Sequence, residues 1–258
     1  MKEHCEIWLF DSRPEEEWVM TFEAHRAVID ELLATWDSDK DFEVRIKHAP
    51  RGRAAVAFTA NAYRYANVVR MLWDQEIYAE TVPLARTCFE SAVLAAWVQQ
   101  SDATVVDALL HETFRNGYNL MKQLKEANVP VPAEVEARVT ALRSAIAKPA
   151  PDISVQKMED MCRSFRGGSQ LYLIFRVLSG ETHALDALRR YLVEDDGELV
   201  PIKNAGDQPG GAVQTSYLVA SSLVWAGRAS DELEMHHPHK KVLRKAARSL
   251  RCYPILHR

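Results

Sequence analysis

Residues 84–98, with the sequence LARTCFESAVLAAWV, are apolar on almost every side of a helix. A helix that is hydrophobic all round is buried, so this segment predicts a core helix that other elements surround. The rest of the chain offers amphipathic helices with short connections, which make neighbouring helices antiparallel. The sequence therefore predicts an all-α fold, a multi-helix bundle with mostly antiparallel neighbouring helices. The expected helices span residues 14–36, 54–75, 77–99, 102–127, 134–147, 154–165, 171–188, 212–233 and 238–251.

Charge and composition divide the sequence into two parts. Residues 1–50 carry thirteen Asp and Glu against six Lys and Arg, and we expect an acidic N-terminal extension with one helix there. Residues 51–258 are predicted to form the helical bundle domain. Within this domain, residues 194–211 are rich in Asp, Gly and Pro, and this composition predicts a long mobile loop.

Composition also excludes several classes of protein. A net charge of −4 and a pI near 6.2 argue against a surface built wholly for nucleic acid. The four cysteines form no C-x-x-C pair, which is typical of a reducing compartment and gives no zinc-thiolate site. We find no signal peptide and no apolar run of roughly 18–20 residues, so we expect a cytoplasmic protein without membrane contact. Glycine-rich nucleotide motifs are missing from the sequence, and we predict no cofactor.

A polar stripe lies along the predicted helix over residues 171–188. It consists of Tyr172, Arg176, Ser179, His183 and Asp186, which fall within about 80° of one another at helical spacing. The imidazole of His183 exchanges a proton near neutral pH, and the guanidinium of Arg176 can hold a phosphate through paired hydrogen bonds. The set could therefore bind a phosphodiester. A solvated helix face would show the same pattern, and this alternative stays open.

Two charged residues, Arg86 and Glu90, lie one helical turn apart on the predicted core helix. Because burial of a lone charge is costly, we expect them to pair with each other, either as an internal salt bridge or as part of a polar pocket with the stripe. Arg86-x3-Glu90 and Tyr172-x6-Ser179-x3-His183 resemble the recurring motifs of an uncharacterised bacterial family of helical proteins of unknown function.

Arg176-x6-His183 is also similar to the loose Arg-x4-6-His signature of HEPN domains (higher eukaryotes and prokaryotes nucleotide-binding). These helical modules include metal-independent ribonucleases. The resemblance covers residues 55–195. It implies that His183 activates a ribose 2′-hydroxyl while Arg176 stabilises the phosphate, with Tyr172 and Ser179 orienting it.

A cluster of acidic and histidine residues precedes the last predicted helix. It comprises Asp231, Glu234, His236, His237 and His239. Glu234-x-x-His237 has the spacing of helical di-iron sites, but such sites need a second Glu-x-x-His, which we do not find. A polar linker explains the cluster better, and no metal ligand is predicted.

The last predicted helix is basic on one side. Residues 235–258 carry seven Lys and Arg and no acid. We consider Lys241, Arg244, Lys245 and Arg248 as binding residues, because a basic amphipathic helix can contact phosphates. The alternative is a helix that covers the core and keeps its cations in water, facing the acidic N-terminal region.

Together these observations predict an HEPN-like, metal-independent RNA-cleaving or RNA-binding protein. His183 and Arg176 are the expected catalytic residues, and Arg86 and Glu90 support the pocket. The expected partners are RNA and a second copy of the chain in a homodimer. The alternative is a non-catalytic helical scaffold or a regulatory interaction protein, in which both polar sets serve packing and partner choice.

Overall fold

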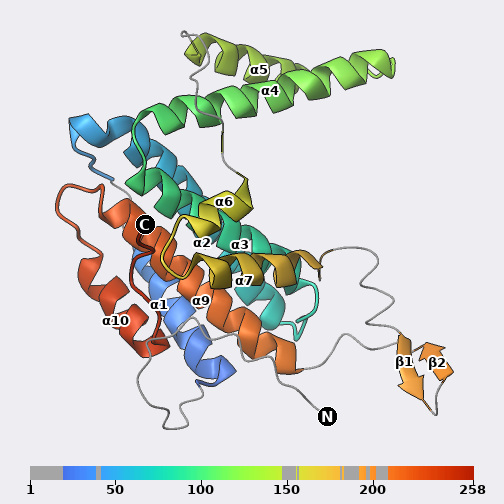
Figure 1. Ribbon diagram of the computed structural model, residues 1–258, viewed down its shortest axis with the longest axis vertical. Coiled ribbons are helices and arrows are strands. Elements are labelled where there is room, and N and C mark those ends of the chain that lie inside the picture. The colour runs from blue at the N-terminus through green and yellow to red at the C-terminus, as the bar shows by residue number, and fades with distance from the viewer. Residues whose placement is uncertain are drawn as a thin grey trace. The chain divides into compact units, whose positions relative to one another are not determined.

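The structure is a computed structural model that describes residues 20–38, 42–146, 155, 157–180, 182, 192–195, 198–201 and 209–258 (Figure 1). Each predicted helix overlaps one helix of the structure, and the all-α prediction is confirmed. The helices are α1 (Phe22–Ser38), η1 (Ile46–His48, a short 3-10 helix), α2 (Ala49–Trp73), α3 (Thr81–Gln100), α4 (Thr104–Glu126), α5 (Ala133–Ala145), α6 (Met158–Arg163), α7 (Gly168–Gly180), α9 (Pro209–Asp231) and α10 (Lys240–Leu250).

The chain forms two compact units. One comprises residues 1–100 and 158–258, and the other comprises residues 101–157. In the smaller unit, α4 and α5 pack against each other as a helical hairpin, with Val139 of α5 buried. The division predicted at residue 50 also concerns residues 1–19 and 39–41, which lie outside the described residues, and it stays a prediction.

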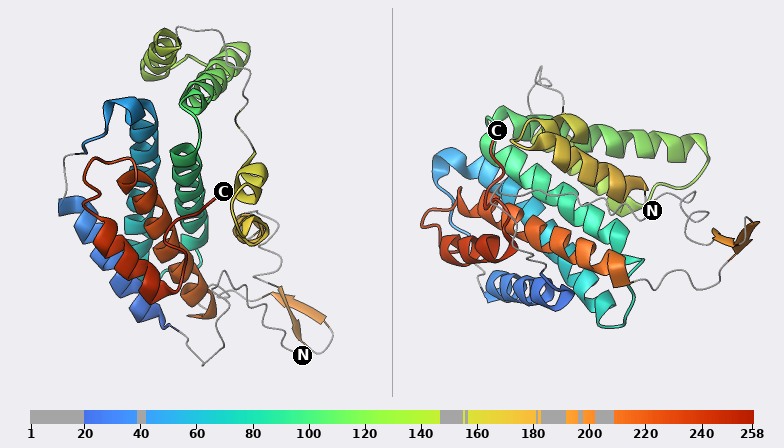
Figure 2. Two further views of the ribbon diagram at one scale, coloured as in Figure 1. Left: turned by 60° about the vertical axis from the view of Figure 1, so that its left-hand side comes forward. Right: turned by 60° about the horizontal axis from the view of Figure 1, so that its bottom comes forward.

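The larger unit consists of three layers of helices (Figure 2). Helices α2, α3 and α9 form the middle layer. Helices α1 and α10 cover one side of it, and α6 and α7 cover the other. The predicted core helix is α3, which packs against α2, α9, α7 and α6. Its side chains Cys88, Phe89, Ala92 and Val93 are completely buried.

Helices α2 and α10 approach α9 closely around Gly227. The hydroxyl of Thr59 on α2 donates to the carbonyl oxygen of Ala226 at 2.9 Å, and Tyr63 donates to that of Leu223 at 3.3 Å. A Cβ at Gly227 would lie only 2.7 Å from the hydroxyl oxygen of Tyr63 and 2.8 Å from Leu243 of α10. Glycine therefore allows α2 and α10 to approach the same turn of α9.

Residues 194–211 differ from the prediction of a long loop. β1 (Leu192–Asp195) and β2 (Glu198–Pro201) form an antiparallel hairpin, and α9 already begins at Pro209. The loop prediction is therefore wrong for the described part of this segment. The sequence between the strands is the dipeptide Asp-Gly, and such a two-residue connection between apolar runs is a strong hairpin signal. No described helix is both long and apolar enough to cross a membrane.

Candidate functional site

The predicted pair Arg86 and Glu90 is present on α3, on the side that faces α7. The Arg86 Nε donates to Glu90 Oε1 at 2.8 Å, and Arg86 Nη1 donates to the hydroxyl oxygen of Thr182 at 3.0 Å. About 29% of the Arg86 side chain and 28% of the Glu90 side chain are exposed, so the pair lies at the rim of the bundle and not in its core. Arg86 thus connects α3 to the residue that directly precedes His183 in the chain.

Two aromatic rings of α7 stack between arginines from two other helices. The guanidinium carbon of Arg86 lies 5.1 Å from the ring centroid of Phe175, and that of Arg163 on α6 lies 5.0 Å from the ring of Tyr172. The centroids of Tyr172 and Phe175 are 6.2 Å apart, with 25° between the ring planes. Cations over aromatic faces attract the ring quadrupole. We call these four residues the arginine–aromatic ladder, and it joins α6, α7 and α3.

Tyr172 also joins two groups of opposite charge. Hydrogen bonding from Tyr172, and next from Arg163, lowers the pKa of the partly exposed Glu159 on α6. Hydrogen bonding to Tyr172 raises the pKa of the exposed Arg176, and Glu159 adds to this effect. Arg176 thus remains charged at the surface of α7, where an anion in solution can reach it.

The structure places the polar stripe only in part. Tyr172, Arg176 and Ser179 lie on α7, whereas His183 and Asp186 lie outside the described residues. The hydroxyl of Ser179 donates to the carbonyl oxygen of Phe175 at 2.6 Å, within its own helix. Ser179 therefore presents an acceptor oxygen, and its proton is already used.

The predicted basic face of α10 is exposed. We call Lys241, Arg244, Lys245 and Arg248 the α10 outer face. On the opposite side of this helix, Leu243 and Leu250 are buried against the bundle. The Nζ of Lys245 donates to Glu31 of α1 at 2.7 Å, so α10 covers the core and faces an acidic residue of the N-terminal region. The α10 outer face and Arg176 lie on opposite sides of the middle layer (Figure 2), and the structure does not bring them together.

The acidic and histidine cluster ties α9 to α10. Arg228 and Asp231 are almost completely buried and form an ion pair at 2.5 Å. Asp231 Oδ1 also accepts a hydrogen bond from the backbone N–H of His239 at 2.9 Å. Burial raises the pKa of Asp231. Within the described part of the chain, no three His, Cys, Asp or Glu side chains are grouped as a metal site would need.

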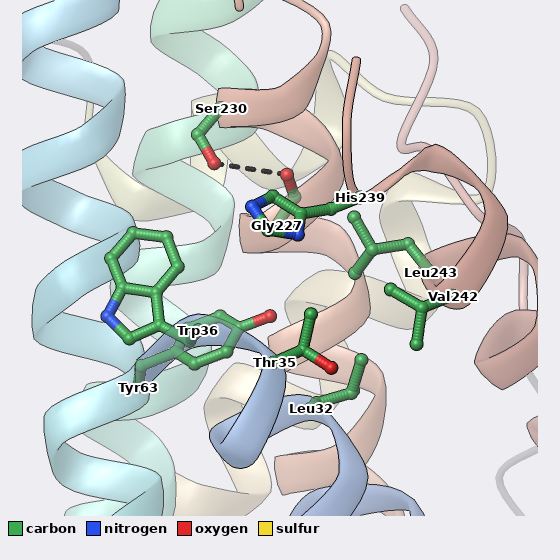
Figure 3. Close-up of a pocket in the computed structure, with 9 residues that line it drawn as sticks. All are labelled: Leu32, Thr35, Trp36, Tyr63, Gly227, Ser230, His239, Val242 and Leu243. Carbon is green, nitrogen blue, oxygen red and sulfur yellow. Dashed lines mark hydrogen bonds between the residues drawn. The ribbon is translucent and has the colours of Figure 1, made fainter. Parts of the chain in front are cut away.

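The cavity drawn in Figure 3 lies where α1, α2, α9 and α10 meet. Its volume is about 10 Å³, which suits a single water molecule at most. The ring of His239 and the hydroxyl of Ser230 border it from above, and Ser230 donates to the carbonyl oxygen of Gly227 at 3.0 Å. This cavity is too small for a substrate.

Sequence reasoning missed the partners that the stripe and the pair acquire from other helices. These partners are Thr182, Phe175, Arg163 and Glu159. Glu159 and Arg163 are four residues apart and pair at 3.0 Å, so their spacing was the one available signal. The contacts of Thr182 and Phe175 depend on how α7 packs on α3, which no spacing within a helix reveals.

The chain matches a known protein family over part of its length. Residues 53–199 match the family described as "Family of unknown function (DUF5677)". This range contains both Arg86-x3-Glu90 and the stripe, which confirms the resemblance to a family of unknown function. The resemblance to HEPN domains stays a prediction. No curated protein and no solved structure matches the chain significantly.

Proposed function

We propose a function from the side chains of this chain, which belongs to DUF5677, a family of unknown function. The proposed function is HEPN-like RNA binding with metal-independent RNA cleavage, at the place where α3 and α7 meet. The proposed site combines Arg86 and Glu90 of α3 with Tyr172, Arg176 and Ser179 of α7 and with His183.

One observation carries this proposal. The hydrogen bond from Arg86 to Thr182 links the Arg-x3-Glu helix to the residue that directly precedes His183. Thr182 and His183 are neighbours in the chain, and consecutive Cα atoms are about 3.8 Å apart. The contact therefore supports a single site in which both motifs take part, with the exposed guanidinium of Arg176 seven residues before His183 in the sequence.

In the proposed reaction, His183 takes the proton of a ribose 2′-hydroxyl. The 2′-oxygen then attacks the adjacent phosphorus, and the bond from phosphorus to the 5′-oxygen of the next nucleotide breaks. The imidazolium or water returns a proton to that 5′-oxygen, which leaves a 2′,3′-cyclic phosphate and a 5′-hydroxyl. Arg176 stabilises the charge on the phosphoryl oxygens, as a fixed guanidinium does.

The test is cleavage of total RNA by the purified full chain in EDTA. His183→Ala should reduce the rate by about 100-fold or more, as loss of a general base does, and Arg176→Ala should also reduce it. Arg138→Ala, on exposed α5 of the smaller unit, is the matched control and should cleave like the wild type. Equal rates in all four proteins, or no cleavage by the wild type, would refute catalysis.

Binding is tested separately with a fluorescent single-stranded RNA and the His183→Ala protein. If Arg176 contacts one phosphate, Arg176→Ala should weaken binding and reduce the slope of log K against log salt by about 0.7. An unchanged slope would mean that Arg176 does not contact RNA.

A second candidate function is a non-catalytic helical scaffold. It is favoured by the internal bonds of the site, since Ser179 donates within its own helix and Arg86 is paired with Glu90. In a scaffold, Arg86→Met with Glu90→Leu should leave folding and self-association unchanged. A loss confined to RNA binding would instead favour the RNA site.

A further inference from the structure

The α10 outer face is a cationic surface with one carboxylate against it. Its four side chains are exposed, and Glu31 of α1 accepts from Lys245 at 2.7 and 3.0 Å. Arg248 donates from Nε to the carbonyl oxygen of Arg244 at 3.2 Å, and its side chain is exposed. Among the residues that the structure describes, one Glu pairs with these four cations, which leaves an excess of positive charge there that attracts further anionic groups.

Helices α1 and α10 lie side by side and run in opposite directions (Figures 1 and 2). Thr35 and Trp36, near the end of α1, line a cavity with His239 and Val242, at the start of α10. Because Lys245 pairs with Glu31, Arg248 lies about one turn closer to the beginning of α1. The basic side chains of α10 thus continue toward the point where the preceding chain enters α1.

The chain before α1 is strongly acidic. Residues 1–19 contain six carboxylates (Glu3, Glu6, Asp11, Glu15, Glu16 and Glu17) and two cations, Lys2 and Arg13. Phe22, the first residue of α1, comes five positions after Glu17, and five extended residues span up to about 17 Å. Arg248 lies roughly 9 Å along the helix from the start of α1 at 1.5 Å per residue, and helices pack about 8–10 Å apart. The acidic residues can therefore reach it.

We propose that residues 3–17 dock on the α10 outer face of the same chain and extend the Glu31–Lys245 ion pair toward Arg248. The occupant of this cationic surface is thus an acidic segment of the protein itself. It excludes external polyanions from α10 as long as it is docked. This inference concerns the side of the bundle opposite to the proposed RNA site, and it holds or fails independently of RNA cleavage.

The direct test is zero-length carbodiimide cross-linking of the full chain, read by peptide mass spectrometry. The Glu31–Lys245 pair serves as an internal positive control, because its atoms are already 2.7 Å apart. We expect additional links from Glu15, Glu16 or Glu17 to Lys241 or Lys245, and we expect these links to disappear in high salt. An equal mixture of ¹⁵N-labelled and unlabelled protein separates links within one chain from links between copies.

A second measurement is elution from a heparin column. Glu15→Gln with Glu16→Gln and Glu17→Gln should expose the α10 outer face and shift elution to higher salt. The matched control neutralises three exposed carboxylates of the smaller unit, Glu126, Glu134 and Glu136, and changes the net charge equally.

Three outcomes would overturn the proposal. Lys241 and Lys245 could link only to carboxylates outside residues 3–17, which would leave the surface open to an external polyanion such as RNA. The links could occur only between labelled and unlabelled copies, which would make the contact intermolecular. Finally, both triple variants could elute at the same salt concentration, which would mean that only net charge matters.

Discussion

The close approach at Gly227 gives the sharpest test of the packing between α2, α9 and α10. In Gly227→Ala, the new methyl carbon would lie 2.7 Å from the Tyr63 hydroxyl oxygen and 2.8 Å from a methyl carbon of Leu243. Tyr63 is 4% exposed and Leu243 is 1% exposed, and the cavity that both border has a volume of only about 10 Å³, so both side chains have little room to move away. Overpacking of this kind costs about 1–3 kcal/mol. The better helix propensity of alanine offsets about 0.5–1 kcal/mol of that cost.

Gly180→Ala is the matched control, because an added Cβ at this exposed end of α7 meets no atom within 4 Å. Both variants exchange Gly for Ala in a helix, so the difference between them isolates the steric cost. We expect Gly227→Ala to have the lower free energy of unfolding, by about 1–3 kcal/mol. Urea unfolding followed by tryptophan fluorescence, to which Trp225 on the same helix as Gly227 contributes, measures it. Equal stability of the two variants would show that α10 does not pack on Gly227 as described.

Three further predictions concern buried ionisable groups. Arg228→Met should lower the free energy of unfolding in urea by about 3–5 kcal/mol, because the Asp231 carboxylate would remain buried without its ion-pair partner. A loss below about 1 kcal/mol would contradict this. Burial lowers the pKa of His25 from 6.5 to about 4. The unfolded chain therefore takes up a proton below pH 6.5 that the folded chain resists, and stability should fall by up to about 3 kcal/mol between pH 6.5 and 4. His25→Gln should flatten this dependence, and an equally steep profile in the variant would assign it to other groups. Burial raises the pKa of Cys88 and Cys252 to about 12, so iodoacetamide at neutral pH should label them only after unfolding, as mass spectrometry would show.

The helices were predictable because apolar spacing and helix breakers are local properties. The sequence of residues 84–98 alone identified α3 as the core helix, because a helix that is apolar on almost every side is buried. The hairpin of β1 and β2 was missed because Asp and Gly were counted as loop composition. Their order, Asp before Gly between two apolar runs, was the informative signal.

The candidate site was predictable only within single helices. Spacing of four residues predicted the pair of Arg86 and Glu90, which the structure contains. The bond from Arg86 to Thr182 and the contact with Phe175 depend on the packing of α7 on α3. A helical period tells which residues share a face, but it does not tell which helix covers that face. Contacts between distant segments therefore needed the structure.

The sequence offered two sets of cations that could contact phosphate, and the structure places them on different helices. Arg176 lies on α7, within the range that matches the family, whereas Arg248 lies on α10, outside that range. Helices pack about 8–10 Å apart, so the axes of two outer layers across a middle layer are roughly 16–20 Å apart. No single phosphate can contact both guanidinium groups across that thickness. A loss of RNA binding on substitution of one set therefore carries no information about the other, and each surface requires its own variant and its own control.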